Sequence, residues 1–291
     1  MARDLLERDG GSQALLRQAE ERLQMPLGRL MLEGPEPELQ STENAQPAIV
    51  FHSLALLRLV AARGLEPVAV AGHSLGEFAG LVAVQALDPL DALSAVQARG
   101  EAMSVAAPSG TGMVAVLGLA DEMVERLCAE GSSVVVANYN APGQVVISGT
   151  DAGLDAIRPK LEAAGARRLV RLSVSGAFHS PLMAQAARSF AAALAKIPLR
   201  GLHRPQVFNA DAQVHQEAAE ARRLVVGQLT GPVLWTQSVQ RLQQLGIDAY
   251  VEIGPRRTLT GLVKKILPAA VVHNIEDLVS MKTLLETIRV G

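Results

Sequence analysis

The clearest pattern in the chain is a short apolar run followed directly by a helical repeat. Val68-Ala69-Val70-Ala71 is continuously apolar, as in a parallel strand that is buried on both faces. The next segment has one apolar face at helical spacing, formed by Leu75, Phe78, Ala79, Val82 and Ala86. Gly72-His73-Ser74-Leu75-Gly76 stands between the two. The pattern predicts a strand, a tight turn that carries Ser74, and a helix.

The chain before this run has a helical pattern. Residues 1–6 and 12–23 are amphipathic, and residues 48–62 fit a buried helix that ends at Gly64. The prolines between these segments, Pro35, Pro37 and Pro47, indicate a loop. No strand is predicted ahead of the first helix, although a doubly wound α/β domain usually opens with one.

The helix that follows the Ser74 region carries an unusual inward residue. Asp88 is a good N-cap and Pro89 suits the first helical position, so a helix begins there. Its apolar side includes Val96 and Met103, and Arg99 shares that side because the three are spaced i, i+3, i+7. No acidic side chain stands three or four positions from Arg99. We therefore predict that Arg99 faces inward without a partner on its own helix.

A buried guanidinium needs a counter-charge, because burying an unpaired charge costs free energy. An acidic side chain elsewhere in the fold, such as Glu77, would be one solution. An anionic ligand would be another, since the planar guanidinium of Arg99 can hold a carboxylate through two hydrogen bonds. The sequence leaves both alternatives open.

The pattern changes after Gly110-Thr111-Gly112. Predicted strands and helices then follow the order β-α-β-β-α-β up to residue 174, which is the order of a ferredoxin-like unit. Its two middle strands are joined by the turn Tyr139-Asn140-Ala141-Pro142-Gly143. Signals of an α/β domain resume afterwards. We therefore expect residues 112–174 to be an insert in a larger domain formed by residues 1–111 and 175–291.

The segment after the insert carries the best candidate for a catalytic base. His179 lies in Ser175-Gly176-Ala177-Phe178-His179-Ser180-Pro181, a loop between a strand and a helix, where catalytic groups are common. A single histidine is usually only a polar surface residue. Of the six histidines, however, four have no special setting, and His73 is expected to point away from Ser74. His179 is therefore the preferred base for Ser74.

Composition narrows the class of protein. The 291 residues can bury a substantial core, and an apolar share of 49% argues against disorder. The 27 basic and 29 acidic residues give a net charge of -2, whereas a nucleic-acid-binding protein would carry a basic surplus. The single cysteine, Cys128, excludes an internal disulfide and suits a reducing cytoplasm. We expect a cytoplasmic protein without a nucleic-acid partner, a membrane segment or a metal site.

The Gly-x-Ser-x-Gly pattern between a strand and a helix is typical of a serine nucleophile. The turn would lift the Ser74 hydroxyl clear of the sheet at the positive end of the helix. The N–H of Leu75 would then be free to stabilise an oxyanion. A chance serine in a glycine-rich turn is the alternative, and the strand–turn–helix context favours the nucleophile.

Five sequence motifs, the first of which contains the Ser74 turn, occur in order along the chain. They are Gly72-His73-Ser74-Leu75-Gly76-Glu77, Gln97-Ala98-Arg99-Gly100, Asn140-Ala141-Pro142-Gly143-Gln144, Gly176-Ala177-Phe178-His179-Ser180 and Glu252-Ile253-Gly254-Pro255. Together they resemble the malonyl-CoA:acyl-carrier-protein transacylase family, which includes the acyltransferase domains of polyketide synthases. The resemblance implies an α/β-hydrolase-like parallel-sheet domain that carries the ferredoxin-like insert. We expect His73 and Asn140, which lie in two of the motifs, to bind substrate.

The resemblance also implies roles for individual residues. Ser74 would be the acylated nucleophile and His179 its base, with the imidazole oriented by a backbone carbonyl rather than by a carboxylate. Arg99 matches the arginine that pairs with the free carboxylate of the malonyl group. Phe178 matches a position where phenylalanine accompanies malonyl and serine commonly accompanies methylmalonyl.

The chain departs from the family pattern at its start. Family members begin with a strand that runs into Gly-Gln-Gly-Ser-Gln, and the first glutamine supplies the second N–H of the oxyanion hole. The sequence here begins after that segment, and Gly11-Ser12-Gln13 follows a helix instead of a strand. The expectation is a sheet short of one strand and an oxyanion hole with the Leu75 N–H alone. Losing one such donor typically costs about 10²–10³ in rate.

The expected function is acyl transfer by a ping-pong route. Malonyl-CoA would acylate Ser74, and the phosphopantetheine thiol of an acyl carrier protein would then take the malonyl group, in fatty acid or polyketide synthesis. No permanently bound cofactor is expected. One alternative is a serine esterase or thioesterase of the α/β-hydrolase class, which needs a triad acid and has no use for Arg99. The other is a truncated, impaired transacylase that only docks its partners.

Overall fold

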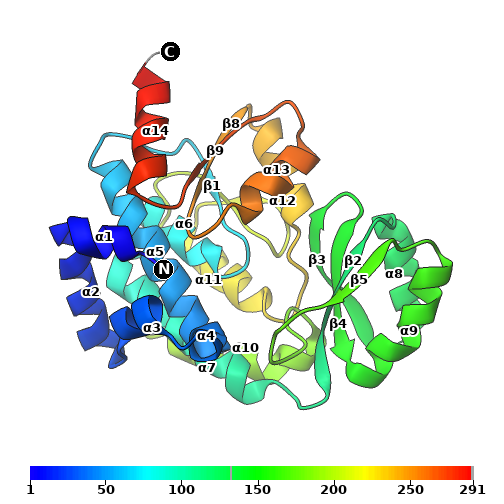
Figure 1. Cartoon of the computed structure of the whole chain (residues 1–291). Helices are drawn as coiled ribbons and strands as arrows, with labels where there is room; N and C mark the ends of the chain where they lie inside the picture. The colour runs from blue at the N-terminus through cyan, green and yellow to red at the C-terminus, as the bar shows by residue number, and fades with distance from the viewer. Residues whose placement is uncertain (132, 290–291) are drawn as a thin grey trace.

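The computed structural model describes residues 1–131 and 133–289, which form two bodies of unequal size (Figure 1). The larger body combines short parallel strands with most of the helices, and the smaller one is a four-stranded antiparallel sheet with two helices. This mixed α/β architecture is the fold class predicted from the sequence. Within the described ranges, every helix is too short or too polar to cross a membrane.

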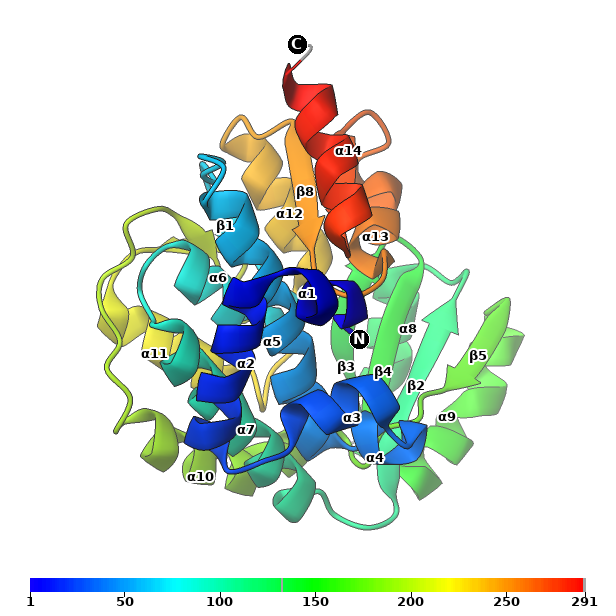
Figure 2. The same ribbon diagram turned by 60° about the vertical axis from the view of Figure 1, so that its left-hand side comes forward.

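Five helices open the chain and lie together on one side of the larger body (Figure 2). They are α1 (Arg3–Arg8), α2 (Gly10–Leu23), α3 (Leu27–Glu33), α4 (Glu36–Gln40) and α5 (Thr42–Ala61). The predicted loop around the prolines is wrong, because α3 and α4 occupy most of it and Pro47 lies inside α5. A proline near the start of a helix removes one backbone hydrogen bond, and the burial of α5 offsets that loss. The earlier start of α5 buries Gln46 in the core.

The predicted strand and helix around Ser74 are present, but the prediction of a strand buried on both faces is wrong. Only residues 70 and 71 form the strand, both are half-buried, and Val68 is 73% exposed. Strand β1 (Val70–Ala71) leads into the turn, and α6 (Gly76–Ala83) follows it. Strand β1 pairs in parallel with β6 (Gln206–Val207), and β6 pairs antiparallel with β7 (Val214–His215). Because β1 and β6 are parallel, the segments that follow them leave the sheet at the same edge. The residues after the two strands are therefore brought together.

Helix α7 (Pro89–Ala106) begins after Asp88, as predicted. It packs against α5 and against α10 (Ala184–Leu194) through the main hydrophobic core. The backbones of α7 and α5 come close together at Gly100, since a Cβ there would lie 2.9 Å from the Thr42 carbonyl oxygen. The inward face of α7 is thus held firmly against the helices that surround it.

The small antiparallel unit has the strand order β3-β4-β2-β5. Its elements are β2 (Thr111–Leu117), α8 (Asp121–Ala129), β3 (Val134–Ala141), β4 (Gln144–Thr150), α9 (Asp151–Ala163) and β5 (Arg168–Arg171). This is the ferredoxin-like order predicted from the sequence. The unit has a hydrophobic cluster of its own, which includes Val116, Ile147 and Leu161. That separate core distinguishes the unit from the larger body, while the bounds expected for the insert, residues 112–174, stay a prediction.

The remaining elements return to the larger body. They are the short 3₁₀ helix η1 (Pro181–Met183), α11 (Ala218–Gly227), α12 (Trp235–Gln244), β8 (Ala249–Ile253), α13 (Thr258–Ile266), β9 (Val271–Ile275) and α14 (Leu278–Arg289). Strands β8 and β9 are parallel and form a two-stranded sheet. Trp235 is buried in the hydrophobic cluster that includes residues of α12 and α13.

Candidate active site

Ser74 sits on a strained turn at the end of β1. Its φ angle is 51°, in the left-handed region that non-glycine residues seldom adopt. The turn is closed by a hydrogen bond of 2.9 Å from the Gly76 N–H to the His73 carbonyl oxygen, and α6 begins immediately afterwards. Strain of this kind persists only where the surrounding structure enforces it, and it is common at catalytic residues. The geometry is that of the predicted strand–turn–helix motif.

The two glycines of the motif have different structural roles. A Cβ on Gly72 would lie 2.1 Å from the Gly76 carbonyl carbon and 2.3 Å from the Glu77 nitrogen, whereas a Cβ on Gly76 would have nothing within 4 Å. Only Gly72 is required by the close approach of the backbone.

Gly72→Ala should consequently be far more damaging than Gly76→Ala. Overpacking a closed site costs about 1–3 kcal/mol, and more when backbone has to move, so we expect the free energy of unfolding to fall by about 3 kcal/mol or more. Denaturant unfolding of the two variants and the wild type measures the difference. Equal free energies of unfolding for the two variants would contradict the close backbone contact described at Gly72.

The predicted nucleophile and base are in direct contact. The Ser74 Oγ and the His179 Nε2 are 2.9 Å apart, although 105 residues separate them in the chain. The other ring nitrogen, Nδ1, lies 2.8 Å from the Gln228 carbonyl oxygen. Since a carbonyl can only accept, Nδ1 carries the hydrogen and Nε2 is left free to accept the Ser74 proton. A backbone carbonyl thus orients the imidazole, as the resemblance implied.

The imidazole of His179 is kept neutral. Burial lowers the pKa of His179 to about 3, and the positive charge of Arg99 acts in the same direction. A neutral imidazole is the form that can act as a general base. His179 also has a positive φ of 55°, so both members of the pair sit on strained backbone.

Arg99 is buried, as predicted, and reaches the same serine. It is 1% exposed, and one of its terminal nitrogens lies 3.0 Å from the Ser74 Oγ. Its other hydrogen bonds go to the side-chain oxygens of Gln46, at 2.7 Å, and Gln228, at 2.9 Å. Its Nε is buried and has no partner among the described residues. Burial lowers the pKa of Arg99 to about 10, which still leaves the guanidinium charged at neutral pH.

Glu77 is not a direct partner of Arg99. The carboxyl is fully buried at the start of α6, but its oxygens accept from the Asn209 N–H and the Gln228 amide instead. Glu77 acts on Arg99 through its charge only. The suggestion that Glu77 pairs with the guanidinium is therefore wrong as a direct contact. Only the Nε of Arg99 lacks an acceptor among the described residues, because the terminal nitrogen on Ser74 donates to both Ser74 and Gln228. An anionic ligand beside Ser74 would take the place of the hydroxyl as the acceptor of that nitrogen.

The other residues predicted for the site lie around this group. The Leu75 N–H has no acceptor among the described residues and stands at the start of α6. Phe178 precedes His179 and is buried in the main core. His73 points away from Ser74, with its Nε2 at 2.8 Å from the Asn140 side-chain oxygen. The roles proposed for these four residues stay predictions.

The His73–Asn140 hydrogen bond links the two bodies of the molecule. Asn140 belongs to β3 of the small unit, whereas His73 belongs to the turn in the large one. His73 also lies against Trp235, with ring centroids 5.6 Å apart, and burial lowers its pKa. The structure thus assigns His73 and Asn140 a structural contact close to the nucleophile, beside the substrate role predicted for them.

Sequence reasoning missed three polar residues that surround the catalytic group. Gln46 lies in the predicted proline loop, and Asn209 and Gln228 stand outside the five motifs. The Asn209 side-chain oxygen accepts the Ser74 N–H at 2.7 Å, and its amide donates to the Gly72 carbonyl at 2.8 Å. The position of Asn209 after a strand parallel to β1 was the one clue available, because such residues gather at the same sheet edge.

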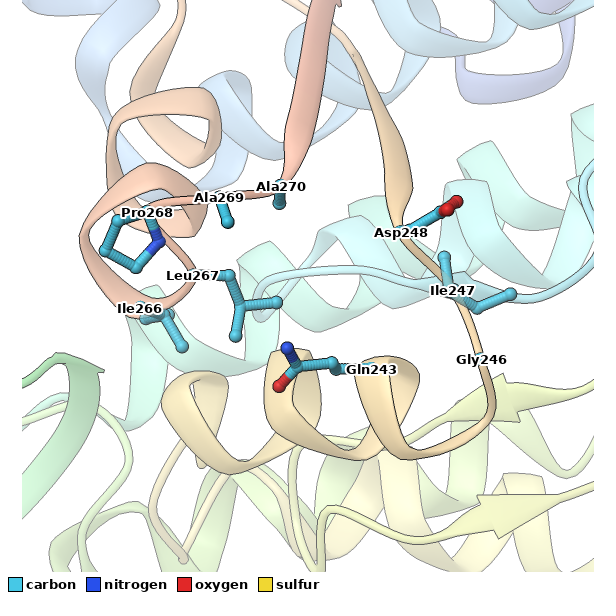
Figure 3. Close-up of a pocket in the computed structure, with 9 residues that line it drawn as sticks. All are labelled: Gln243, Gly246, Ile247, Asp248, Ile266, Leu267, Pro268, Ala269 and Ala270. Carbon is cyan, nitrogen blue, oxygen red and sulfur yellow. The ribbon is translucent and has the colours of Figure 1, made fainter.

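A separate hollow lies away from this site. It has a volume of about 350 Å³ and is formed between the end of α12, the end of α13 and the start of β8 (Figure 3). Its lining is mainly apolar, with Ile247, Ile266 and Leu267 among the labelled side chains. None of the predicted site residues lines it. The residues that line the hollow therefore have no part in the chemistry predicted at Ser74.

Comparison with known proteins agrees with this geometry. The family model described as an acyl transferase domain matches residues 1–284. The malonyl CoA-acyl carrier protein transacylase of Bacillus subtilis is 39% identical over 271 residues, covering 91% of this chain and 86% of the relative. That of Staphylococcus aureus strain MRSA252 is 38% identical over 287 residues, covering 97% and 92%.

Solved structures give the same result. A malonyl-transacylase in complex with its type II polyketide synthase acyl-carrier protein has a TM-score of 0.95 at 37% identity, covering 99% of this chain and 94% of that one. A malonyl-CoA:acyl carrier protein transacylase from Xanthomonas oryzae pv. oryzae has a TM-score of 0.95 at 38% identity, covering 99% and 93%. The chain therefore belongs to the acyl transferase domain family, together with the malonyl CoA-acyl carrier protein transacylases.

Proposed function

We propose that the protein transfers a malonyl group from malonyl-CoA to the phosphopantetheine thiol of an acyl carrier protein. The observation that carries the proposal is that His179 and Arg99 converge on one atom, the Ser74 Oγ, at 2.9 and 3.0 Å. A base on a serine describes many hydrolases, but a buried cation on the same hydroxyl suits an acyl group with a free carboxylate. The names of the relatives agree with this substrate.

The first half-reaction acylates the enzyme. The His179 Nε2 takes the Ser74 proton while the Oγ attacks the thioester carbonyl of malonyl-CoA. The negative charge that forms on the carbonyl oxygen is stabilised by the Leu75 N–H at the positive end of α6. When the C–S bond breaks, the imidazolium gives its proton to the departing CoA thiolate, which leaves as the thiol. The product is malonyl-Ser74.

The second half-reaction runs the same steps with a different thiol. The His179 Nε2 takes the proton of the phosphopantetheine thiol, and the sulfur attacks the malonyl-Ser74 ester. Collapse of the tetrahedral intermediate releases the Ser74 Oγ, which recovers its proton from His179. The Gln228 carbonyl holds the imidazole in one tautomer throughout, so no carboxylate is required behind it.

This arrangement distinguishes the proposed transferase from the alternatives. The esterase alternative needs an acid on the His179 Nδ1, and a backbone carbonyl occupies that position instead. The docking-only alternative has no need of a formed Ser74–His179 pair with a cation on the serine. The pathway served, fatty acid or polyketide, is left open, and the cytoplasmic location expected from the single cysteine is part of the proposal.

Arg99→Ala should harm malonyl transfer much more than acetyl transfer, because acetyl-CoA has no carboxylate for the guanidinium to bind. Charge-assisted hydrogen bonds contribute about 1.5–3 kcal/mol. At 1.4 kcal/mol per tenfold, kcat/KM for malonyl-CoA relative to acetyl-CoA should fall by roughly 10- to 150-fold. Arg99→Lys should recover only part of the preference, since an ammonium cannot form the two-pronged contact.

The measurement is kcat/KM for both thioesters in the wild type and the two variants. Equal losses for malonyl-CoA and acetyl-CoA would mean that Arg99 is structural, and the dicarboxylic substrate would have to be abandoned. Arg222→Ala is a suitable control, because the side chain of that arginine donates to the carbonyl oxygens of Leu194 and Ile197 and to no other group in the part of the chain that the structure describes. It should leave the ratio of the two thioesters unchanged.

A further inference from the structure

Glu77 is a buried carboxyl that the transfer mechanism does not use. It is fully buried in the first turn of α6, three residues after the nucleophile. One of its oxygens accepts the Asn209 N–H at 2.6 Å, and the other accepts the Gln228 side-chain amide, also at 2.6 Å. Burying a carboxyl without access to solvent costs free energy, which its hydrogen bonds to Asn209 and Gln228 offset.

The Gln228 side chain connects Glu77 to Arg99. A guanidinium has donors only, so the group of Gln228 that lies 2.9 Å from Arg99 must be its oxygen. The amide nitrogen then necessarily faces the other way, toward Glu77. The orientation of one amide is thus fixed from both ends.

The donors around Glu77 define its protonation state. Both of its oxygens face donors, the Asn209 N–H and the Gln228 NH₂. A protonated carboxyl would have to place its own O–H against one of these donors. Burial favours that neutral form and raises the pKa of Glu77, while the Asn209 N–H and the charge of Arg99 favour the carboxylate. The hydrogen-bond pattern is that of the carboxylate.

The partners of Glu77 also hold the catalytic pair. Asn209 accepts the N–H of Ser74 at 2.7 Å, and the Gln228 backbone carbonyl orients His179 at 2.8 Å. The Gln228 amide makes a further contact of 3.2 Å with the Ser74 carbonyl oxygen. Glu77 itself touches none of the reacting atoms. Its influence on the site must pass through these two residues.

We propose that Glu77 is a positioning residue for acyl selection: by fixing the Gln228 amide it aims the guanidinium of Arg99 at the acyl group bound near Ser74. This inference rests on the proposed function, in which Arg99 binds the malonyl carboxylate. In Glu77→Gln, the new amide must present its NH₂ either to the Asn209 N–H or to the Gln228 NH₂. The Asn209 N–H belongs to the backbone and cannot turn over, so the new NH₂ has to face Gln228. The Gln228 amide then turns over to accept from it, which places a donor against Arg99 and displaces the guanidinium.

The expected result is a selective loss. Glu77→Gln should lower kcat/KM for malonyl-CoA by about 10- to 100-fold, with less than about a threefold change for acetyl-CoA. A carboxylate that merely weakened the field of Arg99 would act in the opposite direction, because its removal would strengthen binding of the malonyl carboxylate. An increase in malonyl preference would therefore overturn the proposal.

A double-mutant cycle tests whether Glu77 acts through Arg99. If it does, Glu77→Gln should have no further effect on the malonyl-to-acetyl ratio once Arg99 is alanine. A full additional loss in the Arg99→Ala background would overturn the proposal. Glu252→Gln is the matched control, since each carboxylate oxygen of Glu252 likewise accepts an N–H donor, from Leu259 and from Thr260, and neither donor belongs to the Ser74 group. It should leave the ratio unchanged.

Gln228→Met provides a second variant if Glu77→Gln does not fold. It keeps the backbone carbonyl for His179 and most of the side-chain volume, but it removes the link between Glu77 and Arg99. The same malonyl-selective loss is expected, and a wild-type ratio would overturn the proposal. Labelling of Ser74 by phenylmethanesulfonyl fluoride, a neutral reagent, should continue in both variants, and loss of labelling in both would overturn a role of Glu77 confined to acyl selection.

The Arg99→Ala result separates the proposed substrate from the proposed positioning role of Glu77. An unchanged malonyl-to-acetyl ratio in Arg99→Ala alone would reject the proposed substrate class. A changed ratio there, with a wild-type ratio in Glu77→Gln and Gln228→Met, would leave the proposed function intact and reject only the positioning role of Glu77.

Discussion

Ser74→Ala is expected to abolish acyl-enzyme formation. The wild type, mixed with malonyl-CoA, should gain the mass of one malonyl group, and the variant should gain none. Transfer to the carrier protein should fall by about 10⁶-fold, the order of loss seen when the nucleophile of a serine–histidine pair is removed. The physical reason is that the Ser74 hydroxyl alone, among those of residues 1–131 and 133–289, has the His179 base at 2.9 Å and the Leu75 N–H beside it.

Intact-mass measurement before and after addition of malonyl-CoA gives the result directly. Ser94→Ala is a matched control, because the Ser94 hydroxyl bonds to the Leu90 carbonyl oxygen in its own helix. That variant should be acylated like the wild type. A malonyl adduct that survives in Ser74→Ala would mean that another residue is the nucleophile.

The parts of the site that the sequence could predict are those with local signals. Ser74 stands in a glycine-bounded turn between an apolar run and a helical repeat, and the structure has the same three elements. Arg99 was predicted to face inward because Val96 and Met103 lie on the same face of its helix, and all three are buried. A period of 3.6 residues is enough to fix which side of a helix faces the core.

The parts that could not be predicted depend on contacts between distant segments. The Gln228 side chain meets Arg99 across 129 residues and Glu77 across 151. No spacing within the sequence encodes such a contact, and a glutamine after a helix usually lies in solvent. Gln46 was missed for a different reason, since tertiary packing of α5 overrides the helix-breaking tendency of Pro47.

The strands show the same limit. The sequence predicted a strand at residues 68–71, but the structure pairs only two of these residues, Val70–Ala71, with Gln206–Val207 of β6. Short strands of this kind are set by the helices that cover them, which a local apolar run does not reveal. Asn209 is placed by this pairing, so its contact with the Ser74 N–H became visible only in the fold.

His179→Ala is expected to reduce acylation by about 10⁴-fold or more, because the Ser74 hydroxyl loses the base that takes its proton. The rate of malonyl-adduct formation under single-turnover conditions is the measurement. His203→Ala is the control, since that residue is exposed and its backbone, rather than its ring, bonds to Val84. Acylation within tenfold of the wild type would show that His179 is not the base.

The pH dependence of the wild type tests the same residue without mutation. The pKa of His179 is lowered from 6.5 to about 3, first by burial and then by the charge of Arg99. The imidazole therefore stays neutral as the pH falls through 6.5, and acylation should persist where an ordinary histidine would be protonated. In the unfolded chain the ring takes a proton below 6.5 while the folded one does not, so this group lowers stability as the pH falls from 6.5 toward the folded pKa. Measuring kcat/KM for malonyl-CoA from about pH 5 to about pH 8 locates the acid limb. A limb centred near 6.5 would mean that His179 is exposed to water when it reacts, and the dry site with Arg99 beside the base would be wrong.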